Sequence, residues 1–161
     1  MGTDQGSTRP NVSRRMAAQR RRDTGPERAL RSELHRMGLR FRVDSPPLPS
    51  ARIRADVLFR RQEVAVFVHG CFWHGCPEHG TWPRTNAAWW REKIGCNVAR
   101  DASSRELLEA AGWTVVEVWE HDDPHSAALE VRAQVRRATE TVGRRDADAI
   151  AAAATRRRTQ T

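Results

Sequence analysis

Two short apolar segments in the middle of the chain have the pattern of β-strands. Residues 55–59 (ADVLF) and 63–68 (EVAVFV) are rich in β-branched and aromatic side chains and are joined by a tight basic turn. The second segment is apolar on both faces of a strand, which predicts a central, buried position in a sheet. Residues 39–43 form a shorter candidate strand before a Pro-rich loop at 44–50, and residues 113–119 form a further strand.

Helical periodicity flanks these strands. One helix is expected to begin at Thr24, where Thr24 and Glu27 have the spacing of a capping box, and to end at Gly38. A second, long helical stretch runs from residue 85 to Gly112, and an amphipathic helix begins near residue 126. The resulting order, αββαβα, predicts an α/β fold with a mixed β-sheet flanked by helices.

The length of 161 residues is typical of one domain. We expect this domain to span residues 13–140, with a disordered basic tail at 1–12 and a flexible, Ala- and Arg-rich tail at 141–161. The longest apolar run, residues 149–154, is too short to cross a membrane, and the N-terminus lacks the apolar region of a secretory signal. The sequence therefore predicts a soluble, cytoplasmic protein.

The chain is strongly basic, with a formal net charge of +8 at pH 7. Residues 1–42 alone hold 11 Arg against four acidic residues, which is typical of a segment that binds phosphate groups. A charge balance of this kind favours polyanionic partners, with nucleic acid ahead of an anionic membrane surface. For residues 1–12, a solvated disordered tail is the simpler interpretation.

The densest chemistry follows the central strand, in the segment VHGCFWHGCPEHGTW. Cys71, Cys76 and His79 have a spacing that can surround one tetrahedral zinc ion, and His121, after the last strand, can supply a fourth ligand. The alternative is two buried free thiols and two surface imidazoles. Because three cysteines without an export signal argue against a disulfide framework, we favour a closed Cys2His2 site and expect Cys96 to be an unliganded thiol.

Three further side chains could take part in catalysis. His69 and His74 remain once such a zinc site is filled and suit proton transfer, although bonds to backbone carbonyls or alternate zinc ligation fit the same spacing. Asp56 interrupts an apolar strand, where an unpaired carboxylate is costly. Binding of Mg2+ beside a phosphate would explain it, and an exposed position on an edge strand is the alternative.

Several ordered motifs resemble those of one known family. They are FVHGCFWH at 67–74, WREKI at 90–94, the upstream segments RDT and PERAL, and GW and VWE near the last strand. Together they resemble the very short patch repair (Vsr) DNA mismatch endonucleases over residues 13–121.

The resemblance implies a restriction-endonuclease-like core with a structural zinc ion. It also implies an Mg2+-dependent, strand-specific nick in double-stranded DNA, 5′ to the T of a T:G mismatch, which initiates repair of deaminated 5-methylcytosine. The expected protein is a monomer of the bacterial cytoplasm that works on the nucleoid, with mismatch-repair proteins as further partners and no membrane contact. The alternatives are a non-catalytic zinc-stapled DNA-binding protein and a related nuclease that cleaves unmismatched DNA.

Matched position by position, the resemblance also implies roles for single residues. The catalytic set is Asp56 as the metal-binding aspartate, His74 as the catalytic histidine, His69 as its assistant beside the scissile phosphate, and Glu27 as an acidic helper. Val68 stands where the best-known members have a polar residue, so it can serve Mg2+ only through its backbone carbonyl. No proline directly precedes Asp56, which leaves the loop geometry near this metal open.

A second group of matched positions is implied to contact DNA. Phe72, Trp73 and Trp90 match aromatic residues that wedge into the base stack beside the mismatch. Met16, Lys93 and Asn97 match residues that meet the mismatched pair or the opposite groove. Trp90, Lys93 and Asn97 are also three or four residues apart, so a helix would present them on one face.

Overall fold

The computed structural model of the protein describes residues 22–81 and 83–158. The expected tail at 1–12 and the predicted DNA contact Met16 lie outside the described residues. The described elements are, in chain order, α2 (Gly25–Arg36), β1 (Arg42–Ser45), β2 (Ala55–Phe59), β3 (Val64–His69), α3 (Ala87–Ala110), β4 (Thr114–Trp119) and α4 (Pro124–Arg158).

Four strands form one mixed sheet in the order β1-β2-β3-β4. β1 pairs with β2 and β2 with β3 in antiparallel fashion, whereas β3 and β4 run parallel because α3 connects them as a crossover. β3 is therefore a central strand, as its two apolar faces predict. The predicted mixed sheet is confirmed, and β1, which overlaps the candidate strand at 39–43, extends the expected order αββαβα to αβββαβα.

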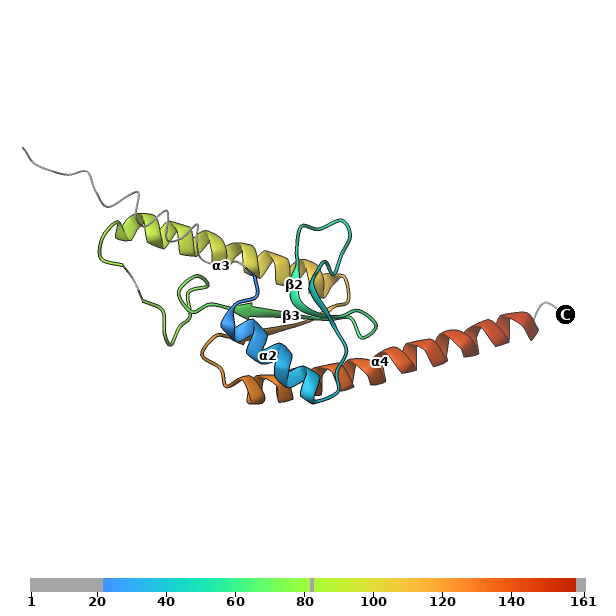
Figure 1. Ribbon diagram of the computed structural model, residues 1–161. Coiled ribbons are helices and arrows are strands. Elements are labelled where there is room, and N and C mark those ends of the chain that lie inside the picture. Colours follow the sequence, from blue (N-terminus) through green and yellow to red (C-terminus); the bar gives the residue numbers. More distant parts are fainter. Residues whose placement is uncertain (1–21, 82, 159–161) are drawn as a thin grey trace, which may run out of the picture.

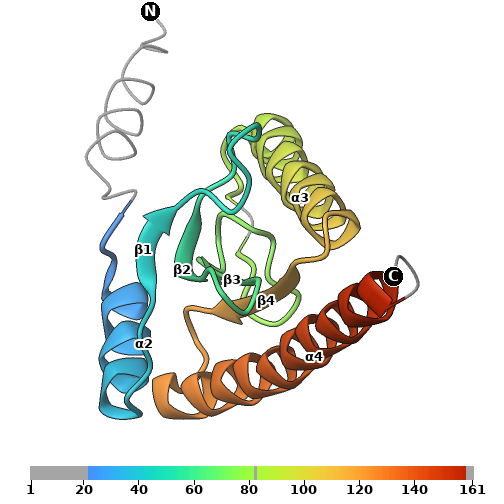
Figure 2. The same ribbon diagram turned by 90° about the vertical axis from the view of Figure 1, so that its right-hand side faces the viewer.

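Helices cover both faces of the sheet and give the molecule three layers (Figure 1, Figure 2). α3 lies on one face, and α2 and α4 pack side by side on the other. On the α3 face, Leu108 packs with Leu58, Ala65 and Trp113. The core on the other face includes Leu30, Leu34, Val57, Val66 and Val131. Each such Leu or Val contributes about 1.5–3 kcal/mol on burial, so both layers hold the sheet rigidly in place.

The start of α2 follows its capping pattern only in part. Thr24 is the N-cap, but its hydroxyl donates to Glu27 Oε1 (2.9 Å) instead of accepting from a helix N–H. Glu27 Oε2 accepts from the backbone N–H of Asp23 (2.9 Å), so the glutamate half of the capping box is present and shifted by one residue. Gly38 follows the helix with φ +78°, a conformation that ends helices and favours glycine.

Several boundaries differ from those expected. β1 begins at Arg42 instead of residue 39, and α3 begins at Ala87. α4 begins at Pro124 and is helical to Arg158, through most of the segment 141–161 for which we expected a flexible tail. Figure 1 shows α4 extending beyond the rest of the molecule. In the part of the chain that the structure describes, no helix is both long and apolar enough to cross a membrane.

Candidate active site and metal centre

Three chain segments meet at one edge of the sheet. β2 begins at the edge where the antiparallel strand β3 ends, and β4, which runs parallel to β3, ends there as well. The strand pairing therefore brings Asp56 near the start of β2, His69 at the end of β3 and His121 just after β4 to the same edge. The loop between β3 and α3 starts from this edge and carries the remaining candidate residues.

The first part of this loop is packed tightly against α3. Gly70 O accepts from Trp73 N (3.1 Å), and Asn97 of α3 donates through Nδ2 to Trp73 O (3.0 Å). Gly75 has φ +63°, and a Cβ at this position would lie 3.3 Å from Val98 Cγ2. Glycine is therefore favoured at this position both by the backbone conformation and by the close approach of the loop to α3.

The four predicted zinc ligands come together in the structure. One ligand atom from each of Cys71, Cys76, His79 and His121 lies within 4.8 Å of the others. His121 Nδ1 is 3.0 Å from Cys71 Sγ and 3.8 Å from Cys76 Sγ. Burial, together with Cys76 and Glu120, raises the pKa of the Cys71 thiol to about 11, and a bound cation would favour the thiolate instead. Two sulfur and two nitrogen donors fit the set that structural zinc takes.

A second cluster combines two imidazoles and a carboxylate. His69, His74 and Asp101 offer ligand atoms within 4.8 Å of one another. His74 Nδ1 is 2.5 Å from Asp101 Oδ2, and the ring centroids of His69 and His74 are 4.3 Å apart. Because Asp101 engages Nδ1 of His74, Nε2 of that ring is left to exchange a proton. Burial and the neighbouring His74 lower the pKa of His69.

Helix α3 orients both histidines of this cluster. Asp101 contacts His74 directly, and Arg105, one turn further along, pairs with Glu117 of β4. Glu117 Oε1 in turn lies 3.6 Å from His69 Nε2. The sequence interpretation did not select Asp101 or Glu117, because each contact joins segments that are far apart in the chain. For Asp101 a signal was available in its spacing, because it lies four residues after Asn97 and a helix places both on one face.

Asp56 is half-buried on β2, between two other strands, so it does not lie on an edge strand. Its Oδ2 accepts from the backbone N–H of Val68 (2.7 Å). Burial is the largest influence and raises the pKa of Asp56 to about 6, the Val68 N–H lowers it, the charge of Glu27 raises it and Arg31 lowers it. A carboxylate with this balance gains from a nearby cation.

The backbone N–H of Val68 contacts Asp56, and the strand geometry places the Val68 carbonyl on the same side. His69 O accepts from Glu120 N (2.9 Å) beyond the end of the β3–β4 ladder. Neighbouring residues of a strand direct their N–H and C=O groups to opposite sides, so those of Val68 face β2. The Asp56 carboxylate and the Val68 carbonyl are oxygen donors of the kind that could hold Mg2+.

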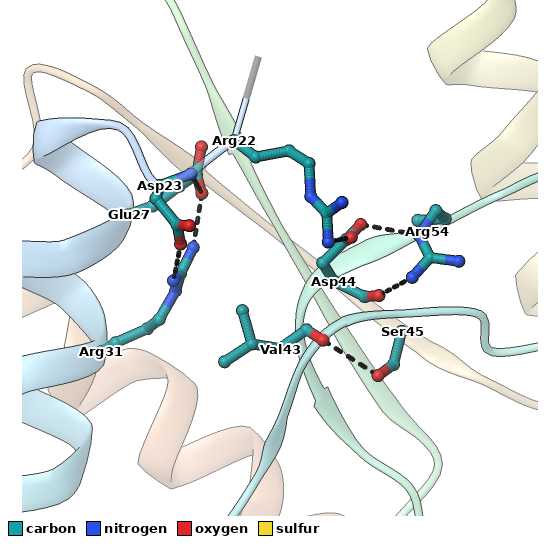
Figure 3. A network of polar contacts seen from close by, with 8 residues as sticks. All are labelled: Arg22, Asp23, Glu27, Arg31, Val43, Asp44, Ser45 and Arg54. Carbon is teal, nitrogen blue, oxygen red and sulfur yellow. Dashed lines mark hydrogen bonds and ion pairs between the residues drawn. The ribbon is translucent and has the colours of Figure 1, made fainter. Parts of the chain in front are cut away.

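Glu27 is buried at the start of α2, where an ion-pair network surrounds it (Figure 3). Arg31 Nη2 lies 2.5 Å from Glu27 Oε2. Beside this pair, Asp44 of β1 binds Arg22 and accepts from Arg54 Nε (2.7 Å). Arg22 reaches from the residues before α2 to β1, so the network ties the start of this helix to the outermost strand of the sheet (Figure 3).

Comparison with known proteins identifies the family of this chain. The family model "DNA mismatch endonuclease Vsr" matches residues 6–79. The type II nicking enzyme V.NaeI of Lentzea aerocolonigenes is 44% identical over 74% of this chain and 73% of the relative. V.XorIIP of Xanthomonas oryzae pv. oryzae is 41% identical over 70% of this chain and 82% of the relative. The DNA mismatch endonuclease Vsr of Escherichia coli is 40% identical over 67% of this chain and 68% of the relative. This chain belongs to the Vsr family.

Membership in the Vsr family confirms that the chain is an endonuclease that acts on DNA. At this level its function is that of a mismatch or site-specific nicking endonuclease. The alternative of a non-catalytic DNA-binding protein is therefore set aside.

The predicted wedge residues of this Vsr-family chain form one aromatic cluster. The ring centroid of Phe72 lies 5.1 Å from that of Trp73 and 5.1 Å from that of Trp90. Trp90 is buried, whereas Phe72 and Trp73 are half-buried. Trp89, which the sequence interpretation did not single out, packs edge-on against Trp90 and is 50% exposed. The exposed aromatic surface at the start of α3 is thus larger than the motifs indicated.

The two predicted DNA contacts further along α3 differ in their surroundings. Lys93 is exposed on α3, as a DNA contact requires. Asn97 is half-buried, and its amide already holds the Trp73 carbonyl. Cys96 is exposed on the same helix and lies outside the Cys/His cluster.

Proposed function

We propose that this endonuclease makes an Mg2+-dependent nick in one strand of double-stranded DNA, 5′ to the T of a T:G mismatch. The observation that supports the proposal links two groups through neighbouring residues of β3. The N–H of Val68 contacts Asp56, and the ring of the next residue, His69, lies 4.3 Å from that of His74, which is paired with Asp101. The name of the Escherichia coli relative, DNA mismatch endonuclease Vsr, supports a mismatch as the substrate. T:G mismatches arise when 5-methylcytosine is deaminated, so the nick would initiate repair of that damage.

Asp56 and the Val68 carbonyl would hold the Mg2+. Their fit rests on the raised pKa of Asp56, because a carboxylate penalised by burial is stabilised by a hard cation with oxygen ligands. When bound, the ion would offset the negative charge that develops at the phosphate and lower the pKa of a water molecule.

The histidines would move the proton. Asp101 holds His74 through Nδ1, so Nε2 is free to take a proton from the attacking water or to pass one to the leaving 3′-oxygen. His69 would lie beside the scissile phosphate as an assistant. Glu27 would act through its charge, which favours the protonated form of Asp56 in the absence of metal.

The Cys71, Cys76, His79 and His121 cluster would hold a structural Zn2+. All four positions would be protein ligands, so no position remains for an activated water. The site would join the loop after β3 to the end of β4 and thereby position the residues between its first two ligands.

Recognition would combine insertion of aromatic residues with contacts to the mismatch. A T:G pair stacks poorly, so inserting Phe72, Trp73 and Trp90 costs less there than at a Watson–Crick step, where unstacking takes about a few kcal/mol. Lys93, Asn97 and Met16 would meet the mismatched pair or the opposite groove. The net charge of +8 would supply affinity that does not depend on sequence.

We also propose that residues 13–140 form a restriction-endonuclease-like nuclease domain that works as a monomer on the bacterial nucleoid, with mismatch-repair proteins as partners. The mixed sheet with helices on both faces supports this architecture.

A strand-labelled duplex library tests the proposal. It would carry T:G in every flanking context, with matched T:A and C:G duplexes, in the presence and absence of Mg2+. We expect nicks 5′ to the T, in T:G duplexes only and with Mg2+ only. Equal cleavage of matched duplexes at one sequence would instead support a nuclease that nicks unmismatched DNA; V.NaeI and V.XorIIP are named as type II nicking enzymes.

A further inference from the structure

We propose that His69, His74 and Asp101 form a second transition-metal site, separate from the Cys2His2 cluster, and that Zn2+ bound there inhibits nicking. The binding of the ion depends only on the geometry of these three side chains. The inhibition also rests on the proposed function, because it requires His74 to exchange a proton during cleavage.

The three side chains converge from three elements. His69 ends β3, His74 lies in the loop and Asp101 belongs to α3, and their ligand atoms lie within 4.8 Å of one another. His69 has a side chain only 9% exposed, and those of His74 and Asp101 are 23% and 22% exposed. Three protein ligands at a partly open position match the arrangement in which zinc keeps a fourth site for water or an added ligand.

The positions of these ligands are set in advance by packing. At Gly75 the loop lies so close to α3 that an added Cβ would be 3.4 Å from Ile94 Cγ2 and 3.3 Å from Val98 Cγ2. Asn97, one turn before Asp101, holds the loop through the Trp73 carbonyl. An ion at this site would replace the hydrogen bond between His74 and Asp101 and release its proton, and it would meet side chains that packing already holds together, which favours affinity.

A second carboxylate stands behind His69. Glu117 Oε1 lies 3.6 Å from His69 Nε2 and is itself paired with Arg105. Carboxylates that contact a ligating histidine in this way orient its ring and raise its basicity as a ligand.

The chemistry of the donor atoms distinguishes three metal sites in the protein. Imidazole nitrogens suit Zn2+, Co2+ and Ni2+, whereas Mg2+ prefers oxygen ligands and would stay with Asp56. The Cys2His2 cluster is distinct, because the ring of Trp119 packs against both His69 and His121, with centroid distances of 5.4 and 6.3 Å. Zn2+ on His69, His74 and Asp101 would occupy the side chains proposed to move the proton and leave the Mg2+ ligands untouched.

Metal titration of the full chain tests the binding. Protein prepared with one equivalent of Zn2+ is titrated with Co2+, followed by calorimetry and by visible absorption. We expect the wild type to bind a second equivalent of metal, and we expect both Asp101→Ala and His69→Ala to lose this binding. The matched controls are Glu109→Ala, an exposed acid on α3, and His125→Ala, an exposed histidine on α4; both should retain it. A wild type that takes no second equivalent, or an Asp101→Ala and a His69→Ala that both keep it, overturns the site.

Nicking of a T:G duplex in excess Mg2+ tests the inhibition. As the second Zn2+ equivalent binds, we expect the rate to fall about 10²-fold or more, the contribution typical of a proton-transfer group. Brief chelation that removes only the second equivalent should restore it. A filled site with an unchanged rate overturns the inhibition, while absence of nicking at one equivalent overturns the proposed function and leaves the binding result standing.

Discussion

Asp56 and Asp101 are two carboxylates with different surroundings and different expected tasks. Asp56 is half-buried with a pKa raised to about 6, and its Oδ2 accepts from the backbone N–H of Val68. Asp101 is bonded to an imidazole 27 positions earlier in the chain. The first is suited to a cation and the second to orienting a base, so the two substitutions should have different consequences.

Asp56→Ala should reduce nicking of a T:G duplex by orders of magnitude while leaving DNA affinity within several-fold. The carboxylate would act on the transition state, whereas phosphate contacts elsewhere supply docking. Single-turnover nicking and a binding titration on the same duplex measure the two effects. Asp148→Ala, an exposed acid on α4, is the control. Full activity in Asp56→Ala would remove this residue from the active site.

The raised pKa of Asp56 also predicts a dependence of stability on pH. Below its ordinary value of 3.8 the carboxyl is protonated in both the folded and the unfolded state and has no effect. As pH rises from 3.8 to about 6, the unfolded state ionises first, so stability is lost, by at most about 3 kcal/mol, and stays lost above pH 6.

Asp56→Asn should therefore stabilise the protein at pH 7.5 in Mg2+-free buffer and should change its stability little at pH 4. Urea unfolding at both values measures the difference. A gain that is equal at the two pH values would show that ionisation of Asp56 is not its cause.

The loop between β3 and α3 gains its shape from two attachments: its packing on α3 and the Cys/His cluster at its other side. Gly75 and Asn97 provide the first, and His121 of the segment after β4 provides the second. A loop held at both sides can present His74 in a fixed position, which a free loop of this length cannot do.

Gly75→Ala should destabilise the protein by about 1–3 kcal/mol, the usual range for a strained backbone, because its φ of +63° disfavours a side chain and the new Cβ crowds Val98. It should also slow nicking, since the loop would move His74 away from Asp101. Gly95→Ala on α3 has open space around its Cβ and should be neutral or stabilising. Thermal unfolding and nicking rates of the two variants make the comparison. Equal stability in both variants would contradict the packing argument.

Cys71→Ser and His121→Ala should each lose the zinc equivalent and much stability, because structural zinc in small peptide sites contributes about 10–16 kcal/mol of apparent binding free energy. Cys96→Ser should keep both. Native mass spectrometry with metal analysis and thermal unfolding provide the measurements. A zinc equivalent that survives in His121→Ala and disappears in Cys96→Ser would assign the fourth ligand differently.

The three layers bring unrelated parts of the chain to one working edge. The sheet supplies Asp56 and His69, α3 supplies Asp101 and the aromatic Trp90, and the loop supplies His74. Catalytic and mismatch-contacting residues would therefore lie on one rigid framework. An aromatic residue inserted in the DNA would then also place the DNA backbone at the catalytic groups.

Trp73→Ala should reduce the preference for T:G over T:A more than it reduces non-specific affinity. The side chain would act on base stacking, whereas the basic surface of a chain with net charge +8 supplies contacts to phosphates that both duplexes share. Binding to both duplexes over a range of salt concentrations separates the two contributions. Equal losses on T:G and T:A would make Trp73 a packing residue of the aromatic cluster.

Local patterns in the sequence were sufficient for the elements and for the candidate ligands. The strand at 55–59, the buried central strand and the long helix before Gly112 follow from periodicity and end signals, which act over a few residues. The Cys and His spacing likewise selected the four side chains that the structure brings within 4.8 Å. Thr24 and Glu27 show the limit of such patterns, because an alternative hydrogen bond of the hydroxyl replaced half of the capping box.

Tertiary structure alone decided which distant side chains meet. The bonds from Asp101 to His74 and from Asn97 to Trp73 join residues 27 and 24 positions apart, and the Cys71–His121 contact spans 50. It also buried Trp90 and left its neighbour Trp89 half exposed. Periodicity specifies which face of an element is apolar, but the partner of a polar side chain depends on how layers pack and on strand order, and these are set by the summed burial of the whole core.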